Sequence, residues 1–302
     1  MLSRVFGRSH TRRSQSRNQE NLPTTRKAPK LHPLSRSVLL PHPPNSSDLL
    51  PNTFTHFLCT EGEKTTSHCL ETHQISASVR AKMIDWMVEV TCAFHMSMET
   101  FFLSVKVMDY FLCKSGVKYG DDSVHLIGIT CMLVASKYEE VEPFRVKTMV
   151  EIVAKHKFSA LDILAMELVV LDAISFEVHL LTPIHVLGYL CDTLRLSPGI
   201  QQTAEILLVI NQMSIVVQTA PPSLQAVAAL MLVCAGLKKP EVLPLLVPYA
   251  QGRETQRLAV QMKANVVMYH RENEQSVLPK YLNFKFQEGQ ELPLVVKTKG
   301  GW

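Results

Sequence analysis

The segment MIDWMVEV, residues 83–90, is an apolar run that carries two carboxylates one helical turn apart. Its apolar residues recur at three- and four-residue spacing, which predicts a helix with at least one buried face. Asp85 and Glu89 are four residues apart, so they share one face of that helix. Burying a carboxylate is costly unless it is paired. The two residues therefore indicate an acid/base pair, a metal site, or a surface for another protein.

The same helical spacing continues on both sides of this segment, from Phe54 to about residue 270. Capping residues and N-terminal prolines divide it into elements. Helices are expected at about residues 80–94, 99–112, 124–137, 146–155 and 160–174, then at 183–195, 198–219, 222–237, 240–249 and 253–270. Glycine is scarce, with 12 in 302 residues, which also favours helix. We predict an all-α protein with two consecutive five-helix folds, at 51–178 and 179–287, and an irregular tail at 288–302.

Residues 1–50 lack this periodicity and are rich in Arg, Ser, Pro and Asn, which predicts a disordered basic tail. Residues 1–45 carry nine Lys or Arg and one Glu, a charge of +8, so the chain total of +4 leaves −4 for the rest. A basic tail can contact nucleic acid or act as a nuclear address. Because the charges are spread out, we favour a solvated leader.

The seven cysteines include no C-x-x-C pair, and most lie in apolar segments. This pattern predicts reduced core residues of an intracellular protein, in the nucleus or the cytoplasm. No apolar stretch approaches the ~20 residues that span a bilayer, and the N-terminus shows no signal-peptide core. We therefore expect no membrane partner.

Neither chemical explanation of the two carboxylates finds support elsewhere in the sequence. The motifs G-x-S-x-G, G-x-x-x-x-G-K-[ST] and H-E-x-x-H are absent, and no group facing Asp85 and Glu89 can be named, so we expect no enzyme activity. Five possible zinc ligands cluster upstream: His56, Cys59, His68, Cys69 and His73. Their second pair is not separated as finger-type sites require, so we expect no metal and no other cofactor.

Several charged residues lie in otherwise apolar helices. Lys137 ends the apolar run 126–136, and Glu167 lies within the apolar run 164–171. Each predicts a partner or an open groove, because an isolated buried charge is costly. Arg80 and Asp109, on successive predicted helices, can pair for the same reason. The alternative for any one of these four residues is that its apolar stem lies along the protein while its charged end reaches solvent.

Four ordered segments of the first half resemble one known family. VRAKMIDWMVEV (79–90) resembles the opening of the cyclin box, MRAILVDWLVEV, and ETFFLSV (99–105) with DYFL (109–112) resembles ETLxLAV and DRFL. ASKYEE (135–140) resembles ASKF/YEE, and ME at 166–167 with ISF at 174–176 is similar to a fourth family segment. APPSLQA (220–226) and QSVLPKY (275–281) are similar to LPSxIA and SIREKY of mitotic cyclins. The chain is identified as a member of the cyclin family, of the A/B or mitotic-like type, over residues 54–286.

The resemblance implies two five-helix cyclin folds and a regulatory, non-catalytic role. Such a cyclin forms a heterodimer with a cyclin-dependent serine/threonine kinase, activates it by gripping its mobile helix, and helps to set its substrate choice in cell division. The resemblance implies these kinase-binding residues: Lys137, Glu140, Glu167, Leu171 and Phe176. It also implies that Arg80 pairs with Asp109 and that Asp85 is a structural carboxylate.

The resemblance further implies a docking patch for R-x-L peptides of substrates. Its residues are Val79, Met83, Trp86 and Glu89, the first three forming an apolar floor. The sequence departs from the family at Lys82, where an apolar residue is usual, at His125, which is often Gln, and at Tyr110, which is Arg in DRFL. Lys82 is expected to repel an arginine-bearing peptide.

The predicted tail holds one further motif. Arg36-Ser37-Val38-Leu39 fits R-x-x-L, the core of the mitotic cyclins' destruction box, which implies a contact with ubiquitin-ligase machinery; chance occurrence in an Arg-rich stretch is the alternative. A cyclin-fold scaffold for transcription or nucleic-acid binding, without kinase activation, is the rival function. It predicts a basic face on the folded part, and the charge of −4 outside the tail argues against it.

Overall fold

The computed structural model describes residues 55–56, 58–59, 61, 66, 69–272, 278–282, 284–286, 292 and 294–296. All of them belong to one unit that spans residues 50–302. The predicted tail 1–50, with Arg36 and Leu39, lies outside the described residues, as does His68 of the upstream cluster.

Serine caps begin three helices of the first half. The side chains of Ser76, Ser97 and Ser159 accept hydrogen bonds from backbone N–H groups of the first helical turn, and Ser159 forms a capping box with Asp162. The elements are α2 (Ala77–Ala93), α3 (Met98–Lys114), α4 (Val124–Glu139), a short α5 (Val146–Thr148) continued by a π-helical turn (Met149–Val153), and α6 (Ala160–Ala173).

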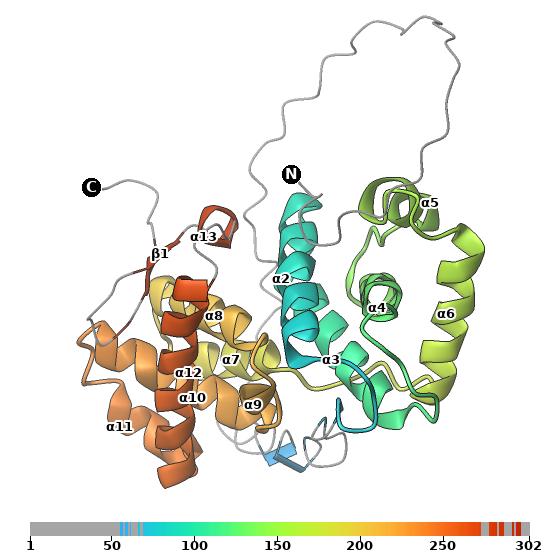
Figure 1. The fold of residues 1–302 in the computed structure, drawn as a ribbon. Helices are drawn as coiled ribbons and strands as arrows, with labels where there is room; N and C mark the ends of the chain where they lie inside the picture. Colours follow the sequence, from blue (N-terminus) through green and yellow to red (C-terminus); the bar gives the residue numbers. More distant parts are fainter. Residues whose placement is uncertain are drawn as a thin grey trace, which may run out of the picture. The chain divides into compact units, whose positions relative to one another are not determined.

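Helix α4 is the centre of the first half. It is apolar on all sides, and its residues from Val124 to Ser136 are buried except Leu126. A helix of this kind must be covered all round. Figure 1 shows α4 nearly end-on, with α2, α3, α5 and α6 around it, and α2, α3, α6 and the π-helical turn all contact it. This arrangement places the last turn of α4, with Lys137, beside α6.

Prolines begin the main helices of the second half, at Pro183, Pro198 and Pro222. The helices are α7 (Pro183–Thr193), α8 (Pro198–Asn211), α9 (Ile215–Gln218), α10 (Pro222–Gly236), α11 (Leu243–Leu246) with a 3₁₀ turn (Val247–Tyr249), and α12 (Arg253–Glu272). Helix α10 is buried along most of its length and contacts α7, α8 and α12, so it is the counterpart of α4.

Two predicted helices of the second half are wrong in extent. The helix expected at 198–219 ends at Asn211, and only Ile215–Gln218 continues as α9. At the break, the carbonyl of Gln212 accepts a hydrogen bond from the Arg80 side chain of α2. The helix expected at 240–249 shrinks to the four residues of α11 and the 3₁₀ turn, in a segment that contains Pro244 and Pro248.

The C-terminal segment is more ordered than predicted. After α13 (Leu278–Tyr281), strand β1 (Phe284–Phe286) pairs antiparallel with β2 (Leu294–Val296). The hairpin crosses the predicted boundary at residue 287, so the prediction of an irregular tail at 288–302 is wrong for residues 294–296. Leu292 packs on Gly236 at the end of α10, so closely that a Cβ at position 236 would lie 2.2 Å from the Leu292 Cβ. Apart from this hairpin, the helices confirm the all-α prediction; the division into two five-helix folds stays a prediction.

Four helices end in the same way, with a residue other than glycine in the left-handed conformation. These residues are His95, Ser175, Arg195 and Lys238, with φ of 51–56°. In each case the next N–H bonds back to the carbonyl five residues earlier, as in the 2.9 Å bond from Leu196 to Cys191. This is the Schellman ending, in which glycine is the usual residue.

Candidate partner-binding face

A charged pair lies where α4 ends against α6. The Nζ of Lys137 is 2.5 Å from Oε1 of Glu167, although the two residues are 30 positions apart in the chain. The Lys137 side chain is 44% exposed and that of Glu167 is 10% exposed. Lys137 lies in the last turn of α4, where the helix dipole favours a cation. The structure therefore brings the two predicted charges together at the edge of the protein.

Exposed apolar side chains surround this pair. On α6, Ile163 and Val170 are buried in the protein core, whereas Leu164, one turn before Glu167, and Leu168, directly after it, are 40% and 65% exposed. Other exposed apolar residues of the same half are Tyr138, Val141, Ile152, Leu161 and Val169. Leu161, Leu164 and Leu168 share one exposed face of α6, and an exposed apolar face of this kind indicates a protein–protein interaction site. We call Lys137, Glu167, Leu164, Leu168 and Phe176 the α4–α6 face.

Phe176 reaches this face through an unusual backbone. It follows Ser175 after the end of α6, and both residues have positive φ, 53° and 59°. Holding an aromatic residue in this conformation costs free energy, and other interactions of the folded chain or of its complex must offset that cost. The Phe176 side chain is 65% exposed, so core packing does not supply that reason. Leu171, the other predicted apolar contact, is half-buried.

Glu140 is engaged within the chain. Its Oε1 accepts hydrogen bonds from the Ser97 backbone N–H (2.7 Å) and the Thr100 hydroxyl (2.6 Å). The carboxylate therefore caps the N-terminus of α3, a favourable place for negative charge. Sequence reasoning missed this role, because residues 97 and 140 are far apart in the chain. Glu140 as a kinase contact stays a prediction.

Arg80 and Asp109 form a buried ion pair between α2 and α3. Two N–H groups of the guanidinium donate to the two carboxylate oxygens at 2.8 and 2.6 Å, and both side chains are about 1% exposed or less. A third N–H donates to the Gln212 carbonyl at 3.0 Å. The arrangement satisfies the buried charges and ties α2 to the second half of the chain.

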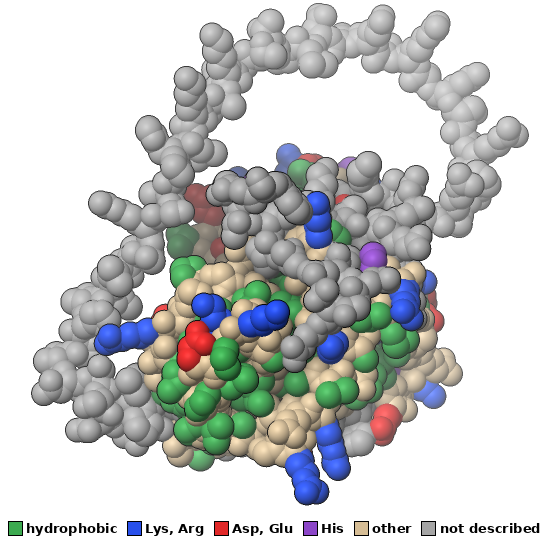
Figure 2. All heavy atoms as spheres, turned by 90° about the vertical axis from the view of Figure 1, so that its left-hand side faces the viewer, with side chains coloured by type: hydrophobic (Ala, Val, Ile, Leu, Met, Phe, Trp, Pro, Cys, Tyr) green, Lys and Arg blue, Asp and Glu red, His purple; other side chains and the backbone are tan. Residues whose placement is uncertain are grey.

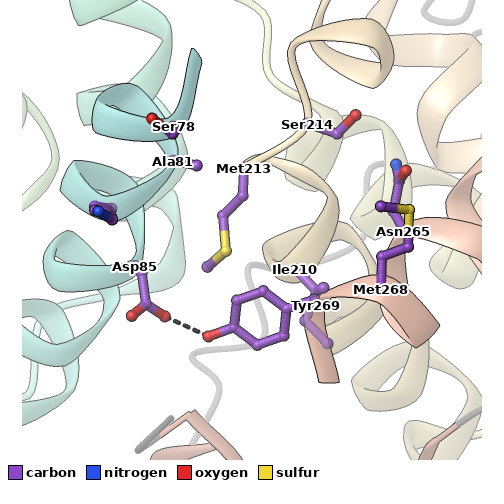
Figure 3. A pocket seen from close by; sticks show the side chains of 10 residues that line it. Ser78, Ala81, Asp85, Ile210, Met213, Ser214, Asn265, Met268 and Tyr269 are labelled. Carbon is purple, nitrogen blue, oxygen red and sulfur yellow. Dashed lines mark hydrogen bonds between the residues drawn. The ribbon is translucent and has the colours of Figure 1, made fainter. Parts of the chain in front are cut away.

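Asp85 also bonds across the two halves. The Tyr269 hydroxyl of α12 donates to Asp85 Oδ1, as Figure 3 shows. The two residues line a pocket of about 350 Å³ between α2, the end of α8 and α12, into which Met213 projects. Burial raises the pKa of Asp85, although the bond from Tyr269 acts in the opposite direction. This contact places Asp85 in the packing of α2 against α12, and the sequence carried no signal for Tyr269.

The predicted docking patch does not present an open apolar floor. Met83 is fully buried and lies over Gly128 of α4, where a Cβ would be 2.1 Å from the Met83 Cε. Trp86 is 4% exposed, and its ring meets the edge of His125 at 5.1 Å. Val79 is half-buried, Glu89 is 8% exposed, and Lys82 is exposed.

The imidazole of His125 belongs to the same packing. Burial, aided by nearby Lys157, lowers the pKa of His125 to about 4. His125 therefore remains neutral at physiological pH and packs as an aromatic ring between Trp86 and Phe158. Tyr110, the third departure from the family, is buried in α3 with the Lys114 ammonium 5.4 Å from its ring centre.

A second exposed apolar surface lies on the second half. Leu245, Val247 and Val260, from α11, the 3₁₀ turn and α12, are 49%, 66% and 70% exposed. Figure 2 looks onto this side and shows hydrophobic side chains beside lysine and arginine side chains. These residues belong to other elements than the α4–α6 face, so they offer matched control positions.

The described part of the chain carries no sign of a membrane span or of a metal site. No described helix is long and apolar enough to span a membrane. Among the described residues, no three His, Cys, Asp or Glu side chains are grouped so as to hold a metal ion. Of the described members of the upstream cluster, His56 and Cys59 are exposed, Cys69 is buried, and His73 donates a hydrogen bond to the Leu112 carbonyl at 2.7 Å.

Comparison with known proteins agrees with the arrangement of the helices. The family model for the N-terminal domain of cyclins matches residues 52–179. The chain is 29% identical to G2/mitotic-specific cyclin-B1 of Oryzias luzonensis over 163 residues, which is 54% of this chain and 40% of that protein. It is 37% identical to G2/mitotic-specific cyclin-A of Hydra viridissima over 108 residues, 36% of this chain and 25% of that protein.

A solved structure shows the same fold. A viral cyclin from herpesvirus saimiri superposes with a TM-score of 0.64 at 20% identity, covering 72% of this chain and 96% of the viral protein. The chain spans about a quarter to two fifths of the length of the first curated relatives. The first half of this chain therefore matches the N-terminal domain of cyclins, and the relatives that the chain is similar to are cyclins of the A and B types.

Proposed function

We propose that the chain is the regulatory subunit of a cyclin-dependent serine/threonine kinase in cell-cycle control, and that the α4–α6 face binds the kinase. The observation that carries the proposal is the Lys137–Glu167 pair at 2.5 Å, surrounded by exposed Leu164, Leu168 and Phe176. Lys and Glu are depleted at the cores of protein interfaces, so a Lys–Glu pair beside exposed apolar side chains is expected to bond specific polar groups of its partner.

Each part of the face suits a mobile helix of the kinase. Lys137 is a donor and Glu167 an acceptor, so together they can bond backbone groups that a helix end leaves unsatisfied. The leucines and Phe176 would exclude water from these bonds and strengthen them. Activation follows if the face binds the active position of that helix more tightly than the inactive one, because differential binding shifts the population.

The cyclin supplies no catalytic group in this proposal. Of the two carboxylates that raised the possibility, Asp85 accepts a hydrogen bond from the Tyr269 hydroxyl, and Glu89 is buried in α2. Substrate choice through the patch of Val79, Met83, Trp86 and Glu89, and turnover through Arg36 and Leu39, are further parts of the proposal.

The test combines a pull-down from dividing-cell extract with a kinase assay on a histone-type substrate. The wild-type chain is expected to capture a cyclin-dependent kinase and to raise its activity, and the chain alone to phosphorylate nothing. Leu168→Asp is expected to abolish capture, because it puts an unpaired charge into the apolar part of the face. The matched control is Val260→Asp, which changes a similarly exposed apolar residue on α12. Equal capture by both variants would refute the α4–α6 face as the binding site.

A further inference from the structure

A pair of cysteines lies beside the buried Arg80–Asp109 pair. Cys69 is fully buried, and its Sγ is 3.8 Å from Asp109 Oδ1. Cys113 is half-buried and follows Asp109 by one turn of α3, so both side chains lie on the same face of that helix. The Cys69 and Cys113 thiols share a hydrogen bond. Two thiols from distant parts of the chain thus meet at one point.

The backbone around Cys69 is held firmly against α3. The His73 Nε2–H donates to the Leu112 carbonyl at 2.7 Å, and the Tyr119 backbone N–H donates to His73 Nδ1 at 3.2 Å. The Gln74 backbone N–H donates to the Tyr119 carbonyl at 2.7 Å. These bonds fix the segment that carries Cys69 to the end of the helix that carries Cys113.

The electrostatic surroundings shift the pKa values of the two thiols in opposite directions. The pKa of Cys113 is lowered by the hydrogen bond from Cys69, with further help from Lys106 and Lys114, against burial and Asp109. The pKa of Cys69 is raised by the same hydrogen bond and by burial. Cys113 is partly exposed and Cys69 is fully buried, so Cys113 is also the thiol that solvent and a peroxide can reach. A reactive thiol is typically partly exposed and close to cations, and a resolving thiol lies next to it.

We propose that Cys113 and Cys69 form a peroxide-reactive dithiol, with Cys113 as the attacking thiol and Cys69 as the resolving thiol. The Cys113 thiolate attacks the terminal oxygen of a hydroperoxide, the O–O bond breaks, and the departing alkoxide or hydroxide takes a proton. The resulting sulfenic acid is attacked by Cys69, which loses its proton as water departs. In sum, two thiols and one hydroperoxide become one disulfide, one alcohol or water, and one water. This inference is independent of kinase binding.

Cys92 provides a matched comparison. It is half-buried like Cys113, but burial, aided by Glu205, raises the pKa of Cys92 to about 11. Cys92 is therefore expected to stay a thiol at neutral pH and to react slowly. Exposed Cys59 is replaced by Ser in every sample, so that disulfides between molecules do not form.

The experiment treats the folded chain with hydrogen peroxide at neutral pH, blocks the remaining thiols with iodoacetamide, and maps the peptides by mass spectrometry. We expect one cross-linked peptide that joins Cys69 to Cys113 and is lost on reduction, with Cys92 fully alkylated. In Cys69→Ala, Cys113 should accumulate as a sulfenic acid that dimedone traps. In Cys113→Ser, Cys69 should remain a thiol.

Two results with the thiol variants and the wild-type chain would overturn the proposal, and a third comes from a lysine variant. One is alkylation of Cys113 at the same rate as Cys92 after peroxide treatment. The other is oxidation of Cys69 in the Cys113→Ser chain, which would remove Cys113 as the attacking thiol. Because Cys69 is buried, folding of the Cys69→Ala chain is first checked by circular dichroism. If that chain does not fold, the proposal is tested instead by the rate of disulfide formation in Lys106→Met. Loss of the nearby cation should slow the reaction several-fold, and an unchanged rate would count against the assignment.

Discussion

Exchanging the two charges of the α4–α6 face separates their role within the chain from their role toward a kinase. The double variant Lys137→Glu/Glu167→Lys keeps a cation and an anion in contact but reverses their order. In the wild-type chain the pair is at 2.5 Å and the lysine is 44% exposed, so it contributes at most about 1 kcal/mol to folding. The exchanged pair should retain most of this, and helicity and melting temperature should change little.

Kinase binding, unlike folding, should be strongly weakened by the exchange. In the complex both charges would be desolvated against a partner whose donors and acceptors keep their original positions. Mispairing a buried, hydrogen-bonded charge at an interface costs about 2–5 kcal/mol. At about 1.4 kcal/mol per tenfold, the dissociation constant should rise about 30- to 4,000-fold. The single variant Lys137→Glu should bind as weakly and also lose some stability, because it places two carboxylates together.

The assay is titration calorimetry with a purified cyclin-dependent kinase, with circular dichroism as the check on folding. The matched control is the exchange Lys239→Glu/Glu241→Lys, an exposed pair 3.8 Å apart in the second half of the chain. It should bind like the wild type. An unchanged dissociation constant for Lys137→Glu/Glu167→Lys would refute the reasoning, as would equal weakening by the two exchanges.

Three further predictions concern the fold. Arg80→Ala leaves Asp109 buried without its partner and should lower the free energy of unfolding by about 3–5 kcal/mol in urea titrations; a loss below 1 kcal/mol would contradict the pairing described here. Arg195→Gly removes the steric strain of a non-glycine residue in the left-handed conformation, so it should stabilise the chain by about 1 kcal/mol. The melting temperature should rise, and a fall would contradict the strain argument. Burial, with Glu99 nearby, raises the pKa of Glu205 to about 7, so its contribution to stability is present at acid pH and is lost as pH rises through about 7. Glu205→Gln should remove this part of the pH dependence in melting curves between pH 5 and 8, and parallel curves for the two proteins would exclude it.

Helix starts were predictable, and helix ends were less so. Ser97, Ser159, Pro183 and Pro198 mark starts through local chemistry that involves only the next few residues. The ends lack the glycine that usually signals them. For example, α7 ends with Arg195 in the left-handed conformation, and the predicted end overshot the last helical residue, Thr193. A non-glycine residue adopts this conformation only because packing on both sides holds the chain there.

For the candidate site too, the sequence determined some features and the packing of the helices determined others. The sequence by itself determined that Lys137 and Glu167 stand in apolar helices, and the resemblance to cyclins implied their shared role. That they meet at 2.5 Å depends on how α4 packs against α6, which no local pattern encodes.

Only the tertiary structure decided the partners of the other charged residues. Asp85 receives a hydrogen bond from Tyr269, 184 residues away, and Glu140 caps α3 rather than lying free beside Lys137. The physical reason is that helix formation depends on neighbouring residues, whereas a buried polar group must find its partner wherever the packed helices place one. Local sequence therefore specified the helices, and their packing chose which polar groups meet.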